Sequence, residues 1–143
     1  KYLSPTHIEC KGKGDDEFQT FKATIKEGKA SIKGERNKIM EIPEGTVTMF
    51  AFFRIVTQIP RQAGATYVYD YGLEASEMNL KANYRVQVIG KETIIADEVP
   101  VKCWKIKQTG QGIHEQFYWV TEDGLLQRVL IDGRKQMDLQ LGD

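Results

Sequence analysis

Few residues in the sequence stand in a setting that catalysis would need. Nucleophilic catalysis requires a serine, cysteine or threonine beside a base, and the three serines, Ser4, Ser31 and Ser76, lie outside any GxSxG turn. Cys103 and His114 flank one expected hairpin and could approach each other, but a buried thiol and a surface imidazole are commoner. The sequence therefore predicts no catalytic residue and no enzyme activity.

One set of residues could hold a metal ion. His7 and Cys10 lie close together in the sequence and could join Cys103 and His114 in a Cys₂His₂ zinc site. Structural zinc sites usually draw their ligands from two tight turns, whereas ten residues separate Cys103 from His114. The acidic run 15–17 lacks the spaced oxygen ligands of a calcium-binding loop. We therefore expect no metal site and no cofactor.

The composition is that of an ordinary globular chain without net charge. The 143 residues include 41% hydrophobic and 28% charged residues, and the formal net charge is zero. A chain of this length can bury about two-thirds of its unfolded surface in one core, so residues 1–143 are expected to form a single domain. The lack of net charge makes nucleic acid a poor partner, and no apolar run is long enough to span a bilayer.

Lysines gather in two segments of the sequence. The first segment holds Lys26, Lys29, Lys33 and Lys38, and the second lies within residues 102–107. Glutamates and aspartates lie among or beside both groups. We interpret both groups as solvated strand faces, because mixed charges of this kind usually face water.

Alternation of apolar and polar residues dominates the sequence and predicts an antiparallel sheet. From Leu80 to Val88 every second residue is apolar and the residues between are polar, as in a half-buried strand. Glycine-containing turns at 27–28, 109–112 and 122–124 would join consecutive strands into hairpins. Further strands are expected at 18–25, 29–32, 37–42, 66–71, 92–95, 101–108, 113–121, 125–131 and 135–141.

A single segment breaks this alternation and predicts a helix. Thr46 is the expected N-cap and Pro60 cannot continue a helical hydrogen-bond ladder, so the helix should lie near residues 46–58. A helix this rich in phenylalanine must bury its apolar face against the sheet. Four large apolar residues recur at the spacing of that face: Met49, Phe52, Phe53 and Val56.

The two cysteines, Cys10 and Cys103, form neither a CxxC motif nor a disulfide-rich framework. If the protein is secreted, a disulfide between them would close a long loop and contribute about 4 kcal/mol in the chain-entropy model. The alternative is two separate buried thiols. The residues leave both arrangements open.

Five motifs follow one another between residues 41 and 140. They are Pro-Glu-Gly-Thr at 43–46, Tyr-Val-Tyr-Asp at 67–70, Val-Ile-Gly-Lys-Glu at 88–92, Val-Pro-Val-Lys-Cys at 99–103, and the aromatic strand with its Glu-Asp-Gly turn at 117–128. Their order resembles that of a bacterial envelope family known only as a domain of unknown function. The fold of that family is similar to the half-barrel of the LolA and LolB lipoprotein carriers.

This resemblance implies a mainly β (α+β) fold, in which a strongly curved antiparallel sheet, a half-barrel, wraps around one buried helix near residues 46–58. It also implies an extracytoplasmic location, in the periplasm or cell envelope, with a signal peptide removed. The resemblance implies no enzyme activity, and it carries over no functional residues.

Two functions fit these expectations. The first is a binding module whose apolar concavity, lined by Phe50, Phe53, Trp104 or Trp119, takes a lipid or another apolar ligand. The second is a structural or protein-interaction domain whose own helix fills the concavity. The packing between helix and sheet discriminates the two, because an empty apolar space favours the first and close packing favours the second.

Overall fold

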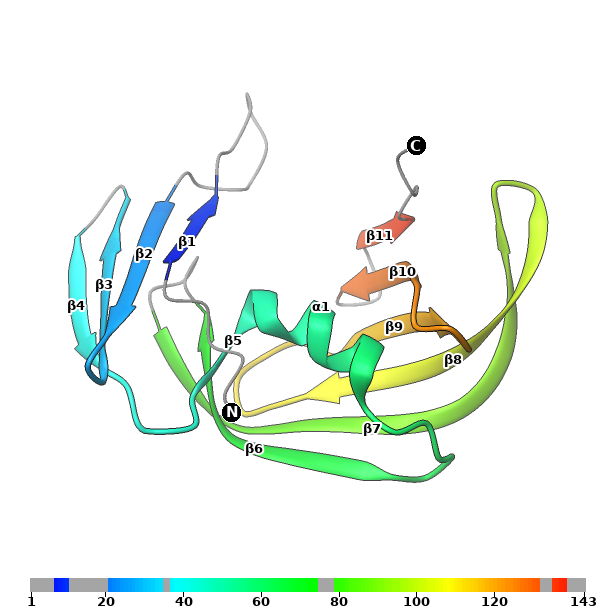
Figure 1. Cartoon of the computed structure of the whole chain (residues 1–143), viewed down its shortest axis with the longest axis horizontal. Helices are drawn as coiled ribbons and strands as arrows, with labels where there is room; N and C mark the ends of the chain where they lie inside the picture. The colour runs from blue at the N-terminus through cyan, green and yellow to red at the C-terminus, as the bar shows by residue number, and fades with distance from the viewer. Residues whose placement is uncertain (1–6, 11–20, 35–36, 75–78, 132–134, 139–143) are drawn as a thin grey trace.

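The computed structural model describes residues 7–10, 21–34, 37–74, 79–131 and 135–138, which form two β-sheets and one helix (Figure 1). The chain is mainly β, and the predicted curled antiparallel sheet with one short helix is confirmed. In chain order the elements are β1 (His7–Cys10), β2 (Phe21–Lys26), β3 (Lys29–Lys33), β4 (Lys38–Glu41), β5 (Val47–Thr48), α1 (Met49–Gln58), β6 (Thr66–Glu74), β7 (Asn79–Ala96), β8 (Val99–Thr109), β9 (Gln116–Thr121), β10 (Leu126–Ile131) and β11 (Lys135–Asp138).

The first four strands form a separate antiparallel sheet in the order β1-β2-β3-β4. Strands β2 and β3 are joined by a tight turn in which Glu27 and Gly28 both have positive φ (51° and 73°), as a type I′ hairpin turn requires. Ala23 and Ile32 are buried in a small cluster together with Leu73 of β6. The half-barrel therefore begins only at β5, and the N-terminal sheet packs against β6.

The half-barrel is a seven-stranded sheet in the order β11-β10-β9-β8-β7-β6-β5. Strands β6 to β11 are antiparallel neighbours, and the two-residue β5 joins β6 in parallel. A bulge interrupts the pairing of β7 with β8 between Val88 and Gly90, and bulges bend a strand and raise its twist. The segment 92–95, predicted as a separate strand, is the end of β7. The resulting sheet curves around α1 (Figure 1).

Helix α1 begins later than the sequence predicted, because β5 occupies the two residues before it. Thr46, the expected N-cap, instead donates its hydroxyl to the carbonyl of Pro43 at 2.7 Å. Thr48 takes the N-cap position and makes no side-chain cap hydrogen bond. The helix ends before Pro60, as predicted. Within the described residues no helix is both long and apolar enough to cross a membrane.

The main core lies between α1 and the concave side of the half-barrel. Phe52 and Val56 of the predicted helical face are fully buried, whereas Arg54 and Gln58, which lie outside that face, are exposed. Phe53, from the same predicted face, is only partly buried. Helix and sheet therefore share one contiguous apolar core, to which the strands contribute Tyr84, Val86, Val88, Ile106, Tyr118, Val120 and Val129.

Candidate functional site

The four aromatic residues that the sequence placed around one cavity do not lie together. Phe53 and Trp104 are partly buried and pack against the core beneath α1. The Phe53 ring meets the edge of the Tyr118 ring, with centroids 6.1 Å apart. Trp119 lies on the opposite face of the sheet, and the side chain of Phe50 falls outside the part that the structure describes. Of the three whose side chains are described, Phe53 and Trp104 therefore lie on the concave side and Trp119 does not.

The position of Trp119 follows from the alternation of side chains along β9. Tyr118 and Val120 belong to the core beneath α1, and neighbouring residues in a strand point to opposite faces. Trp119, between them, packs instead with Ile94 and Cys103 in a second apolar cluster on the outer face. The expectation that Trp119 lines the concavity is therefore wrong.

Side chains of the protein itself occupy the concave side. The Phe52 ring stacks on Tyr84 with centroids 4.9 Å apart and meets the edge of Tyr69 at 5.8 Å. The hydroxyl of buried Tyr118 is hydrogen-bonded to the side chains of Gln108 and Gln116, so this polar group is also satisfied. Two hollows that described residues line, of about 310 and 500 Å³, lie on the N-terminal sheet and at its junction with β6 and β7. Neither hollow lies beneath the helix.

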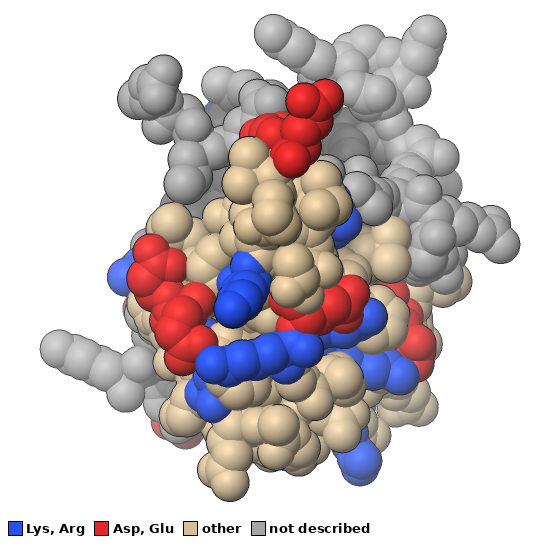
Figure 2. Space-filling view, turned by 90° about the vertical axis from the view of Figure 1, so that its right-hand side faces the viewer, with Lys and Arg blue, Asp and Glu red and all other residues tan. Residues whose placement is uncertain are grey.

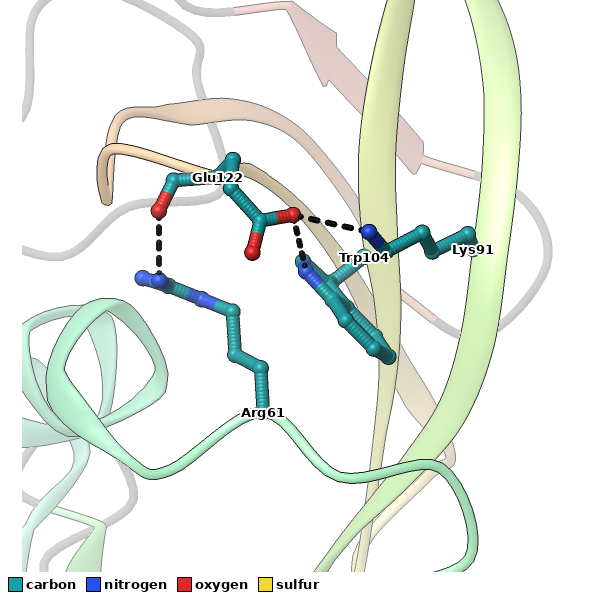
Figure 3. Close-up of polar contacts among 4 residues, drawn as sticks. All are labelled: Arg61, Lys91, Trp104 and Glu122. Carbon is teal, nitrogen blue, oxygen red and sulfur yellow. Dashed lines mark hydrogen bonds and ion pairs between the residues drawn. The ribbon is translucent and has the colours of Figure 1, made fainter.

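A polar cluster ties the end of α1 to the rim of the half-barrel (Figure 3). Arg61, just after the helix, donates to the carbonyl of Thr57 at 2.7 Å and to that of Glu122 at 2.8 Å. The Glu122 carboxylate accepts the indole N–H of Trp104 at 2.9 Å and lies 3.1 Å from the ammonium group of Lys91. Arg61 thus joins the helix to the β9–β10 turn. The carboxylate of Glu122 in turn joins that turn to Lys91 of β7 and Trp104 of β8.

These contacts lower the pKa of Glu122, chiefly through the hydrogen bond from Trp104 and then through Lys91. A carboxylate held in its ionised form by two donors is a poor general acid or base near neutral pH. The cluster contains no nucleophile. Its arrangement suits a structural role, in which Arg61 and Glu122 hold the end of α1 against the β9–β10 turn, rather than catalysis. We call this cluster the Arg61–Glu122 brace.

The lowered pKa gives a pH-dependent prediction. A carboxyl group with a lowered folded-state pKa stabilises the fold above its unfolded value, and this contribution is lost as pH falls through the folded pKa. We expect Glu122→Gln to flatten the loss of stability on acidification below pH 4.5, the ordinary value for glutamate. Denaturant unfolding across that pH range measures the slope. The matched control is Glu98→Gln in the exposed β7–β8 turn, and equal slopes for the two variants would contradict the prediction.

Lysine side chains cover aromatic rings on the outer face. The Lys105 ammonium group lies 5.3 Å from the centre of the Phe117 ring and 5.2 Å from that of Trp119. Lys105 also pairs with Glu92 at 3.1 Å, and Lys107 pairs with Glu115. Figure 2, which looks onto the side bearing the β7–β8 hairpin, shows a band of basic side chains with acidic ones beside it. The local charges therefore compensate one another, as the sequence led us to expect.

Cys103 is a free, buried thiol. Burial raises its pKa, Arg128 acts in the opposite direction, and Glu92 adds to the increase. The thiol is therefore protonated near neutral pH and is not an activated nucleophile. A disulfide with Cys10 was one of the two arrangements that the sequence left open, and the free thiol of Cys103 means that it is not formed in this structure. The side chain of Cys10 falls outside the described residues.

The hypothetical zinc set does not assemble from the residues that can be placed. His114 is exposed and Cys103 is buried on the outer face, while the side chains of His7 and Cys10 are outside the described part. Among the side chains that are described, no group of three or more His, Cys, Asp or Glu residues could hold a metal ion.

No protein-family model matches the chain, and neither a curated protein nor a solved structure matches it. The resemblance to an envelope family with a lipoprotein-carrier-like fold therefore stays a prediction. The function has to be inferred from the geometry of this chain alone.

The Arg61–Glu122 brace was not anticipated from the sequence. Its two key residues lie 61 positions apart, and no motif links them. The one feature visible in the sequence is the glycine of this turn. Gly124 has a positive φ of 94°, and a Cβ atom there would lie 3.2 Å from the Thr57 carbonyl oxygen. The Glu-Asp-Gly turn was recognised as a turn, but its close approach to the helix depends on the tertiary fold.

Proposed function

We propose that the protein is a non-enzymatic binding domain that acts through its outer surfaces, with a half-barrel whose concave side is filled by its own helix. The observation that carries this proposal is the burial of Phe52 and Val56, which are 1% and 0% exposed against the strands beneath them. Interiors packed in this way leave little room for a second apolar molecule. The buried, protonated thiol and the braced carboxylate support the absence of catalysis.

A second candidate function is the binding of a lipid or another apolar ligand on the concave side. The partial burial of Phe53 and Trp104 at the rim favours it, since both could contact a ligand that displaced part of α1. This function requires the helix to move. We also propose an extracytoplasmic location, which rests on the sequence resemblance and can be tested by fractionating the native host.

Native mass spectrometry of protein purified from its host without detergent tests the two functions. We expect the mass of the chain alone, and no saturable binding of a hydrophobic dye that fatty acid or phospholipid displaces. One lipid retained per chain, and lost in Phe53→Ala while retained in Arg54→Ala, would overturn the proposal and support the second candidate. Arg54 is the matched control because it lies on the exposed side of the same helix.

A further inference from the structure

Strand β4 forms an edge of the N-terminal sheet. The order β1-β2-β3-β4 gives it a single hydrogen-bonded neighbour among the described strands, and Figure 1 shows it at the end of the molecule away from the half-barrel. An edge strand presents a row of unpaired backbone N–H and C=O groups, which form a template for another extended chain. The geometry of β4 therefore decides what kind of partner this edge fits.

A hydrogen bond just beyond β4 shows which of its backbone groups point outward. The N–H of Ile42 donates to a carbonyl of the β2–β3 turn at 2.8 Å. Hydrogen-bonded and non-hydrogen-bonded pairs alternate along antiparallel strands, so Lys38 and Met40 bond to β3 as Ile42 does. The N–H and C=O groups of Ile39 and Glu41 therefore point away from β3, toward the open edge.

The β2–β3 hairpin leads to the same assignment. Its two-residue turn makes Lys26 and Lys29 a hydrogen-bonded pair, so the backbone groups of Lys29 point to β2. Those of the next residue, Ala30, point to β4, where Ala30 is directly opposite Met40. Met40 is thus bonded to β3, and the backbone of its neighbour Ile39 faces the edge.

Strand β4 lacks two of the devices that commonly protect a sheet edge. It contains no proline, and its pairing with β3 runs without a bulge. Its Ile39 side chain is 74% exposed, more than any other large apolar side chain in the described part of the chain. By contrast, the edge strand β5 of the half-barrel has only two residues and runs directly into α1.

A second copy of the chain fits this edge when Ile39 lies on a two-fold axis. The axis of an antiparallel pair is perpendicular to the sheet, so side chains of one face meet only side chains of the same face. The two Ile39 residues are then directly opposite each other and exchange both backbone hydrogen bonds. Glu41 is opposite Asn37, whose side-chain amide can donate to the carboxylate. Lys38 is opposite Met40.

Other symmetric registers are less favourable. An axis at Lys38 or at Glu41 sets two like charges directly opposite each other, which is destabilising. An axis at Met40 sets the Glu41 carboxylate against the apolar side chain of Ile39. Only the axis at Ile39 covers the exposed apolar side chain without opposing like charges.

We propose that two copies of the chain associate by antiparallel pairing of β4 with β4, which joins their N-terminal sheets into one continuous sheet with Ile39 on the two-fold axis. A strand pair this short buries less than the roughly 1,200 Å² of a standard interface, so the dimer is weak and depends on concentration. This association goes beyond the proposed function and does not depend on what occupies the concave side of the half-barrel.

Sedimentation velocity from micromolar to millimolar concentration tests the proposal. We expect the average mass to rise from that of one chain toward that of two. Ile39→Pro should abolish this rise but keep the fold, because it removes an N–H group that β3 does not use. The control is Val99→Lys, which replaces another exposed apolar residue on a distant strand and should leave the association unchanged.

Two charge variants test the position of the axis. Ile39→Lys and Ile39→Glu each set like charges opposite each other, so each should weaken the association on the order of tenfold or more. An equimolar mixture of the two should associate again, because opposite charges then meet at the axis. This rescue keeps the test decisive even if thermal melting shows that Ile39→Pro is unfolded.

Nuclear magnetic resonance supplies the check at single residues, where the amide signals of Ile39 and Glu41 should shift with concentration. A chain that stays monomeric at millimolar concentration overturns the proposal. So does a dimer that a folded Ile39→Pro variant still forms, or a mixture of the charge variants that stays monomeric. Binding of an extended peptide of different sequence to β4, without self-association, would instead assign the edge to a foreign strand.

Discussion

Replacing Phe52 with alanine is expected to destabilise the protein by about 3–5 kcal/mol. The ring is 1% exposed, stacks on Tyr84 and meets the edge of Tyr69, so truncation removes apolar burial and two aromatic contacts and leaves a cavity under α1. Such a loss is a large part of the net stability of a small domain. The midpoint of urea unfolding measures the effect.

Arg54→Ala is the matched control for this prediction. Arg54 lies on the exposed side of the same helix, where substitutions usually change stability by less than about 0.5 kcal/mol. Alanine also has the better helix propensity, which favours the control variant slightly. Similar unfolding midpoints for the two variants would mean that Phe52 is not part of the core.

Gly72→Ala is expected to destabilise the protein by at least ~2 kcal/mol. A Cβ atom at Gly72 would lie 2.2 Å from one carbon of the Tyr84 ring and 2.3 Å from another, far inside van der Waals contact. Tyr84 is fully buried beneath Phe52, so the ring cannot swing away without disturbing the core. A single added methyl group in β6 should therefore displace the ring on which α1 packs.

A double-mutant cycle isolates this clash. In a Tyr84→Leu background the glycine no longer faces an aromatic ring, so the added methyl group should cost less than about 1 kcal/mol. Unfolding of the four variants by urea gives the coupling energy. Additive effects of the two substitutions would contradict the close approach of Gly72 to Tyr84.

Local patterns predicted most of the half-barrel. The alternation from Leu80 to Val88 placed Tyr84, Val86 and Val88 on one face, and all three are buried beneath the helix. The spacing of Phe52 and Val56 identified the buried side of α1 for the same reason. Periodicity of 2 or 3.6 residues is visible within one element, so it can be recognised without knowledge of the tertiary structure.

Features that depend on tertiary position were missed. Residues 117–120 are apolar at every position, so alternation could not say which face of β9 carries Trp119. The N-terminal strands looked like those of the half-barrel, because nothing in a strand's own pattern says which sheet it joins. Thr46 precedes the helical pattern as an N-cap would, but the two residues after it pair with β6 and displace the start of α1.

The polar cluster at the end of α1 was missed for a related reason, because Arg61 and Glu122 show no sign of each other in the sequence. Side chains that meet across a long stretch of chain need the fold to bring them together.

The central claim is that α1 itself fills the concave side of the half-barrel. Nuclear Overhauser contacts between aromatic protons, in selectively labelled protein that was never exposed to detergent, test it most directly. The structure predicts contacts of the Phe52 ring with Tyr84 and Tyr69, and of the Phe53 ring with Tyr118, with no signals from a co-purified ligand. Contacts from these tyrosine rings to acyl-chain protons, with those to Phe52 missing, would contradict the claim.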